Sequence, residues 1–180
     1  LDDLDELSLA IINMFKCDKM LDVGKTSQLE RLRDDQILGL KNKIKILQLN
    51  ERVVPYLMQR FECRNLLEIS KLFQPKLLIV THGKDGADFV FGDKVYKKKL
   101  DNSANEVDAT GAGDAFLSVF IKKYYDNLEQ VDYDFIDDTF EEAVKLTSKV
   151  VGHVGARGHL YDKLLNKKLE REEQAEELEL

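Results

Sequence analysis

The stretch Asp108-Ala109-Thr110-Gly111-Ala112-Gly113-Asp114-Ala115-Phe116 decides the fold of this chain. It places two glycines and an acid where a loop is expected to turn into a helix, because apolar residues follow at helical spacing: Phe116, Phe120, Ile121 and Tyr124. The start of a helix leaves several backbone N–H groups without acceptors and with partial positive charge behind them. Small residues let an anion approach these groups closely. The stretch therefore predicts an anion-binding helix N-terminus.

Asp114, in the same stretch, indicates which kind of anion the turn could bind. A carboxylate inside such a turn would normally repel an anion. The combination makes sense if the anion is a phosphoryl group in transfer and the carboxylate addresses the hydroxyl that attacks it. The alternative is an ordinary glycine-rich turn before a buried helix.

A second loop, Thr81-His82-Gly83-Lys84-Asp85-Gly86, directly follows the apolar run 76–80. That run does not alternate, which is typical of a strand covered on both faces. Open α/β sheets bind ligands at such strand ends, although the loop alone could be a plain turn. The chain has no GxxxxGK[ST] P-loop, and Gly111-x-Gly113 lacks a third glycine at dinucleotide spacing. A Rossmann dehydrogenase is therefore disfavoured.

Strand and helix patterns alternate along the rest of the chain, which predicts an α/β class with a mainly parallel central sheet. An antiparallel edge is expected from a hairpin at Gly92-Asp93. The expected helices cover 1–15, 29–44 after a capping box at Ser27, the region of Pro55, 66–73, the segment after Gly113, 139–151 from a cap at Thr139, and a charged C-terminal helix over 161–180. The expected strands cover 19–23, 46–49, 76–80, 88–91 and 94–100.

Composition narrows the function classes. The chain has 180 residues, 43% of them hydrophobic and 34% charged, which indicates a globular domain with a charged surface. A net charge of −7 argues against nucleic-acid binding, and no apolar run is long enough to cross a membrane. Cys17 and Cys63 are expected to be reduced, buried thiols of a cytoplasmic protein. Three histidines, His82, His153 and His159, lack the acids or cysteines of a metal site.

The stretch 108–116, DATGAGDAF, resembles the C-terminal signature of the ribokinase-like (PfkB) family of carbohydrate kinases. Other segments follow in family order. VTHGKDG, 80–86, is similar to the family's T-x-G-x-x-G nucleotide loop, and LQLNERVVPYL, 47–57, resembles its N-x-x-E region. VVGHVGARG, 150–158, resembles a later loop that helps hold the nucleotide and a monovalent cation. The resemblance covers roughly residues 10–160.

The resemblance implies a ribokinase-like three-layer fold, of which this chain would be the C-terminal, nucleotide-binding part over 1–160. It implies transfer of the γ-phosphoryl group of ATP to a sugar hydroxyl. Asp114 would be the catalytic base, and backbone N–H groups would form an anion hole for the transferred group at Gly111, Ala112 and Gly113.

The resemblance also implies ligands for the remaining positions. ATP would be lined by Thr81, Gly83 and Gly86. Asn50 would lie near the phosphates and their Mg²⁺. Asp108 and Thr110 would supply oxygens to a potassium-type cation.

Two departures qualify these implications. The glutamate of the N-x-x-E pattern is replaced by Val53, which weakens the expected contact with Mg²⁺. The family's N-terminal half and its small β lid, which contribute the sugar pocket, are expected to be missing. We therefore expect the isolated chain to be inactive, and to have either a companion chain or copies of itself as partners.

Three functions remain open at this point. The first is a fructokinase- or ribokinase-type sugar kinase. The second is a catalytically silent nucleotide-binding or interaction module, which Val53 and the missing half motivate. The third is a nucleoside or vitamin kinase on the same scaffold.

Overall fold

The computed structural model describes residues 6–100, 107–128 and 130–160. Its helices are α1 (Glu6–Met14), α2 (Ser27–Glu30), α3 (Asp34–Leu38), α4 (Val53–Arg60), α5 (Leu66–Phe73), α6 (Ala112–Asp126) and α7 (Tyr133–Val151), with a 3₁₀ turn over Gly83–Asp85. Its strands are β1 (Met20–Val23), β2 (Ile46–Asn50), β3 (Leu77–Thr81), β4 (Ala87–Phe91) and β5 (Lys94–Lys98). The expected charged helix over 161–180 lies outside the described residues.

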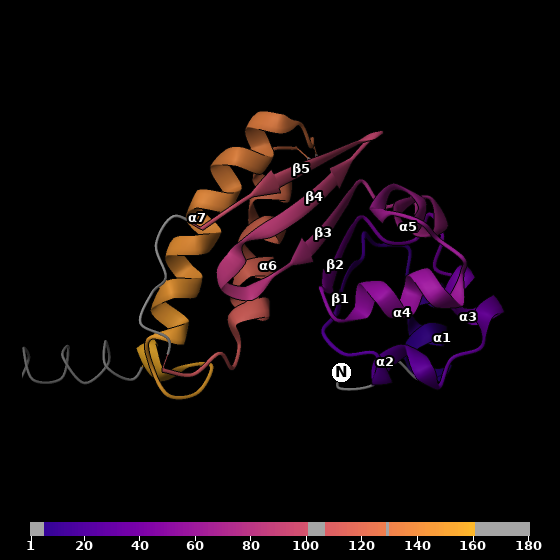
Figure 1. Cartoon of the computed structure of the whole chain (residues 1–180), viewed down its shortest axis with the longest axis horizontal. Helices are drawn as coiled ribbons and strands as arrows, with labels where there is room; N and C mark the ends of the chain where they lie inside the picture. Colours follow the sequence, from indigo (N-terminus) through magenta and orange to yellow (C-terminus); the bar gives the residue numbers. More distant parts are fainter. Residues whose placement is uncertain (1–5, 101–106, 129, 161–180) are drawn as a thin grey trace, which may run out of the picture.

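The strands form one sheet in the order β1-β2-β3-β4-β5 (Figure 1). The first three strands are parallel, and β4 and β5 add antiparallel pairs. Gly92 lies in the turn between β4 and β5 with a φ of 61°, a left-handed conformation that glycine adopts without strain. The predicted α/β class, with parallel strands and an antiparallel edge hairpin, is confirmed.

Helices cover both faces of the sheet and make three layers (Figure 1). Along β2, Leu47 and Leu49 belong to the apolar core beneath α1–α5, whereas Ile46 belongs to the core beneath α6 and α7. This alternation follows from the two-residue period of a strand. The apolar run of β3 is buried throughout, as its lack of alternation predicts.

The segment 29–44 is not the single helix that its apolar spacing predicts. Two short helices, α2 and α3, are joined by a turn, and Ser27 lies inside α2, whose N-cap residue is Thr26. The apolar residues are buried all the same: Leu29, Leu32, Ile37, Leu40 and Ile44. Irregular backbone can therefore bury the same residues that a regular helix would.

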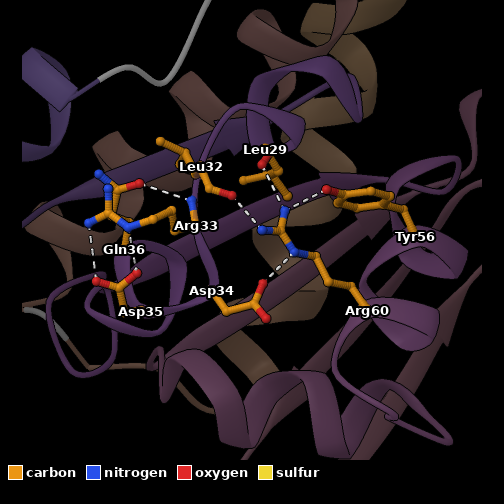
Figure 2. Close-up of polar contacts among 8 residues, drawn as sticks. All are labelled: Leu29, Leu32, Arg33, Asp34, Asp35, Gln36, Tyr56 and Arg60. Carbon is orange, nitrogen blue, oxygen red and sulfur yellow. Dashed lines mark hydrogen bonds and ion pairs between the residues drawn. The ribbon is translucent and has the colours of Figure 1, made fainter.

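Arg60, at the end of α4, holds this turn in place (Figure 2). Its guanidinium contacts Asp34 Oδ1 at 2.7 Å and donates to the carbonyl of Leu29 at 2.9 Å. It also donates to the carbonyl of Leu32 and to the hydroxyl of Tyr56. A planar fork of donors can reach both carbonyls at once. Among the described residues the Leu32 carbonyl has no backbone N–H donor, whereas the Leu29 carbonyl also accepts the N–H of Leu32 at 3.1 Å.

Two further expectations are wrong in detail. Helix α7 begins at Tyr133 rather than at Thr139, because Asp132 caps it by accepting the N–H of Phe135 at 2.7 Å. Cys17 is exposed, and Cys63 is half-buried rather than fully buried. Within the described residues, no helix is both long and apolar enough to cross a membrane.

Candidate functional site

A cavity of about 420 Å³ lies where β2 and β3 end against α6 and α7. Its polar and small lining residues come from the ends of β2 and β3, the loop after β3, the start of α6 and the last turns of α7, and include Asn50, Thr81, Gly83, Gly86, Ala112, Gly113, Thr147 and Ser148. Its apolar lining comes mainly from α6, α7 and the chain after β5: Leu100, Phe116, Phe140, Val144 and Val151. The cavity thus gathers residues of both loops that the sequence analysis singled out.

Asn50 and Thr81 meet because they are neighbours in the parallel register of β2 and β3. The Oδ1 atom of Asn50 accepts the N–H of Arg52 at 3.0 Å, so Asn50 also stabilises the turn into α4. The hydroxyl of Thr81 lies 3.4 Å from the carbonyl of Leu49. The carboxyl ends of adjacent parallel strands therefore bring these two polar side chains to the cavity.

The loop after β3, residues 82–86, is closed by a hydrogen bond of 2.9 Å from the N–H of His82 to the carbonyl of Gly86. Gly86 has a φ of 106°, and a Cβ atom there would lie 2.0 Å from the carbonyl oxygen of Lys98. No other residue fits this position without moving the backbone of β5. Lys84 is exposed and lines the cavity mouth from the same loop.

The start of α6, residues 111–114, is the turn predicted to bind an anion, and we call it the α6 turn. Gly111 is its N-cap residue with a φ of 82°, and a Cβ atom there would lie 2.5 Å from the Cβ of Ala156. The N–H of Ala112 donates to the carbonyl of Ala109 at 3.1 Å. Within the described chain, no backbone acceptor is found for the N–H groups of Gly111, Gly113 and Asp114. The Asp114 side chain is exposed.

Asp108 ties the α6 turn to the loop after α7. Its Oδ1 accepts the N–H of Thr110 and its Oδ2 accepts the N–H of Gly155, each at 2.8 Å. Hydrogen bonds from Thr110, first of its side chain and then of its backbone, together with the Gly155 N–H, lower the pKa of Asp108. Asp108 is therefore held as a carboxylate between the two loops.

Sequence reasoning missed two residues beneath the α6 turn, Asp22 and Gln48. They are register neighbours in β1 and β2, and Gln48 Nε2 donates to the carbonyl of Gly113 at 3.1 Å. Burial raises the pKa of Asp22, against a hydrogen bond from Gln48, and the nearby charge of Asp114 raises it further. One signal could have revealed Gln48: a polar residue in the middle of an apolar strand.

Position 53, where the N-x-x-E pattern has a glutamate, is occupied by Val53. Val53 is fully buried and has no atom that could bind a metal. Glu51 turns instead to His82, whose Nδ1 lies 3.2 Å from its Oε2, and His82 Nε2 lies 3.3 Å from Asp88 Oδ2. Among residues 6–100, 107–128 and 130–160, no group of three or more His, Cys, Asp or Glu side chains is arranged to hold a metal.

The arrangement suits a ligand with an apolar ring system at one part and anionic groups at another. Apolar side chains can enclose the ring, and N–H groups at the start of a helix can bind the anion. The exposed Asp114 carboxylate adjoins those N–H groups, so it can accept a proton from a group that approaches the anion.

A family model described as "pfkB family carbohydrate kinase" matches residues 13–160. Two curated relatives are similar in sequence. Fructosamine kinase FrlD of Bacillus subtilis (strain 168) is 29% identical over 61% of this chain, and probable fructokinase-6, chloroplastic, of Arabidopsis thaliana is 30% identical over 52%. The chain spans 39% and 25% of the lengths of these relatives.

Solved structures share the fold. The Methanocaldococcus jannaschii nucleoside kinase, described as an archaeal member of the ribokinase family, superposes on 89% of this chain with a TM-score of 0.68 and 19% identity. The Xylella fastidiosa fructokinase with bound ATP superposes on 86% with a TM-score of 0.69 and 16% identity. This chain covers 52% of each of those chains. At these identities the likeness concerns the fold.

Proposed function

The chain belongs to the pfkB family of carbohydrate kinases, and we propose that it supplies the ATP site and the catalytic base for phosphorylation of a sugar hydroxyl. The single observation that supports this most strongly is the position of the α6 turn. Its residues Ala112 and Gly113 line a cavity that also gathers Asn50, Thr81, Gly83 and Gly86, and among the described residues the N–H groups of Gly111, Gly113 and Asp114 have no backbone acceptor. These four residues and the α6 turn come from three of the four segments that carry the family resemblance.

The apolar and the polar parts of the cavity lining bind different parts of the nucleotide. The apolar side chains of α6 and α7 enclose the base, and the loop after β3 lies along the phosphates through Thr81, Gly83 and Gly86. The N–H groups of Gly111, Gly113 and Asp114 receive the γ-phosphoryl group. Ala112, which the resemblance also includes in the anion hole, already donates its N–H to Ala109, and its small side chain leaves room for the group. Such fixed donors are effective because they need no reorganisation during the reaction, and removing one in a comparable site costs about 3 to 4 kcal/mol.

Asp114 accepts the proton of the sugar hydroxyl. Its carboxylate is exposed and lies in the same turn as the N–H groups, so the hydroxyl it deprotonates approaches the phosphorus directly. Phosphoryl transfer depends on positioning and charge neutralisation more than on a strong base, because the hydroxyl loses its proton late in a loose transition state.

We propose positions for two cations, Mg²⁺ and a potassium-type ion, from different observations. Mg²⁺ would neutralise phosphate charge near Asn50, the polar side chain that β2 contributes to the cavity, and Val53 contributes no ligand. A potassium-type cation would be held by Asp108 and Thr110, where a carboxylate already joins the two loops that border the α6 turn. Asp108 accepts two N–H groups and keeps lone pairs for such an ion.

Binding calorimetry with ATP tests the ATP site. We expect the wild-type chain to bind ATP, and Thr147→Trp, which fills the cavity from α7, to abolish binding. Lys145→Trp is the matched control, because Lys145 is exposed on α7 and does not line the cavity. Equal affinities in the two variants would contradict the proposed site.

The acceptor is tested with an active assembly that contains this chain. A screen of sugars, nucleosides and vitamins for ATP turnover is expected to find a sugar substrate. Turnover with a nucleoside or vitamin alone would assign another kinase activity on the same scaffold. Nucleotide binding without turnover would favour the silent module, which the replacement at Val53 motivates.

A further inference from the structure

Gln48 is an unusual residue for its position. It is 1% exposed within β2, whose other central residues, Leu47 and Leu49, are buried and apolar. A buried amide lowers stability unless its groups are hydrogen-bonded. Its Oε1 has no partner within the described residues, so the polar side chain is kept here for the contacts of its Nε2 atom.

Those contacts converge on the α6 turn. Nε2 donates to the carbonyl of Gly113 at 3.1 Å, and the amide also hydrogen-bonds the carboxylate of Asp22. A Cβ atom at Gly113 would lie 3.4 Å from Gln48 Nε2 and 3.5 Å from Asp22 Oδ2. The first turn of α6 therefore rests directly on these two side chains, with only the hydrogens of Gly113 between them.

The bond to the Gly113 carbonyl also orients the next N–H. The carbonyl of Gly113 and the N–H of Asp114 belong to one planar trans peptide group, so holding one fixes the direction of the other. The Asp114 N–H is one of the groups without a backbone acceptor in this part of the structure. Gln48 thus controls, from inside the sheet, a backbone donor in the first turn of α6.

Building on the proposed function, we propose that Gln48, with Asp22 beside it, is a positioning residue for phosphoryl transfer. It holds the Gly113 carbonyl so that the Asp114 N–H points at the γ-phosphoryl group. The nucleobase and the other phosphates are bound by residues that Gln48 does not touch. Its effect is therefore specific to the γ-phosphate.

The test compares ADP with a non-hydrolysable ATP analogue by calorimetry. Gln48→Met keeps the length of the side chain and removes the donor. We expect it to reduce the gain in affinity from the γ-phosphate about tenfold, ~1.4 kcal/mol, and to leave ADP affinity unchanged. Gln48→Leu, which also lacks the donor but has a different shape, should have the same effect on both affinities. Ser8→Ala is the control, because it removes a buried polar group of α1 on the opposite face of the sheet.

An equal loss of affinity for both nucleotides would show a merely structural role and overturn the proposal, as would unchanged affinities. The amide ¹⁵N and ¹H shifts of Asp114, measured without ligand, separate this proposal from the proposed function. They are expected to change in Gln48→Met and not in Ser8→Ala, and unchanged shifts would overturn the positioning role. Failure of the wild type to bind either nucleotide would instead refute the proposed function.

Discussion

At the scale of individual residues, the glycines of this chain differ in how strictly their positions require glycine. Gly86 has a left-handed φ and a Cβ position filled by the backbone of Lys98. Gly24 has neither a left-handed φ nor any atom within 4 Å of its Cβ position. Of these two glycines, only Gly86 is therefore required by the geometry of the backbone and its neighbours.

Gly86→Ala is expected to lower the free energy of unfolding by about 1 to 3 kcal/mol from backbone strain alone, with a further loss from the clash with β5. The Gly24→Ala variant should unfold within about 0.5 kcal/mol of wild type. Urea denaturation of both variants measures the difference. Similar midpoints would show that the loop after β3 does not depend on the conformation of Gly86.

Asp114→Asn tests the catalytic base. In an active assembly we expect turnover to fall by about 10² to 10⁴, the range for loss of a positioned acid or base. Nucleotide affinity should remain, since the backbone N–H groups of the α6 turn are retained. Steady-state kinetics combined with calorimetry measures both, and near-normal turnover by a folded variant would exclude Asp114 as the base.

Two carboxylates should have opposite effects on stability as the pH changes. The pKa of Asp22 is raised, mainly by burial, so its charge destabilises the folded state progressively as pH rises above about 3.9. The pKa of Asp108 is lowered by its hydrogen bonds, so its stabilisation is present above that pH and is lost as pH falls.

We therefore expect Asp22→Asn to raise the melting temperature at neutral pH and Asp108→Asn to lower it. Both differences should shrink in acid, where the wild-type carboxyl groups are protonated. Thermal unfolding of the three proteins across pH measures this. An Asp22→Asn variant that is less stable than wild type at neutral pH would contradict the view that burial dominates at Asp22.

At the scale of helices and strands, periodic sequence patterns predicted most of the elements correctly. The predictions were wrong where a single side-chain contact sets the end of a helix. The apolar run of β3, the hairpin at Gly92 and the start of α6 follow from local patterns, and all are confirmed. The break between α2 and α3 depends on Arg60, which lies on another helix. The sequence predicted a cap at Thr139, which is buried inside α7, whereas the residue that caps this helix is Asp132.

The candidate site was predictable to a similar extent. Its loops carry small residues whose pattern is visible in the sequence. Asp22 and Gln48 could not be placed beneath them, because that requires the register of β1 with β2 and the packing of α6 on the sheet. Long-range pairing of this kind leaves little trace in one sequence.

Arg60→Ala is expected to destabilise the fold by about 2 to 3 kcal/mol, because it removes a donor from the Leu29 carbonyl and leaves the Leu32 carbonyl without its donor (Figure 2). Arg33→Ala is the matched control. Arg33 and Asp35 form an ion pair with side chains 65% and 71% exposed, and such pairs contribute about 0 to 1 kcal/mol. Chemical denaturation that gave equal losses for both variants would contradict the role of Arg60.

At the scale of the whole molecule, the chain covers about half of the kinase structures that share its fold, 52% in two cases. The described half contains the proposed nucleotide cavity, and we propose that acceptor-binding residues come from a companion chain or a second copy. The isolated chain should then bind ATP without phosphorylating a sugar. Robust sugar-dependent ATP turnover by these 180 residues would contradict this division.

The most direct measurement is amide chemical-shift mapping of the chain with ADP and with a non-hydrolysable ATP analogue. Both nucleotides are expected to shift the amides of Gly83 and Gly86. Only the analogue should further shift Gly111, Gly113 and Asp114, because its γ-phosphate reaches the α6 turn. Shifts at the α6 turn that are identical for the two nucleotides, or absent, would contradict the claim that this turn binds the transferred phosphoryl group.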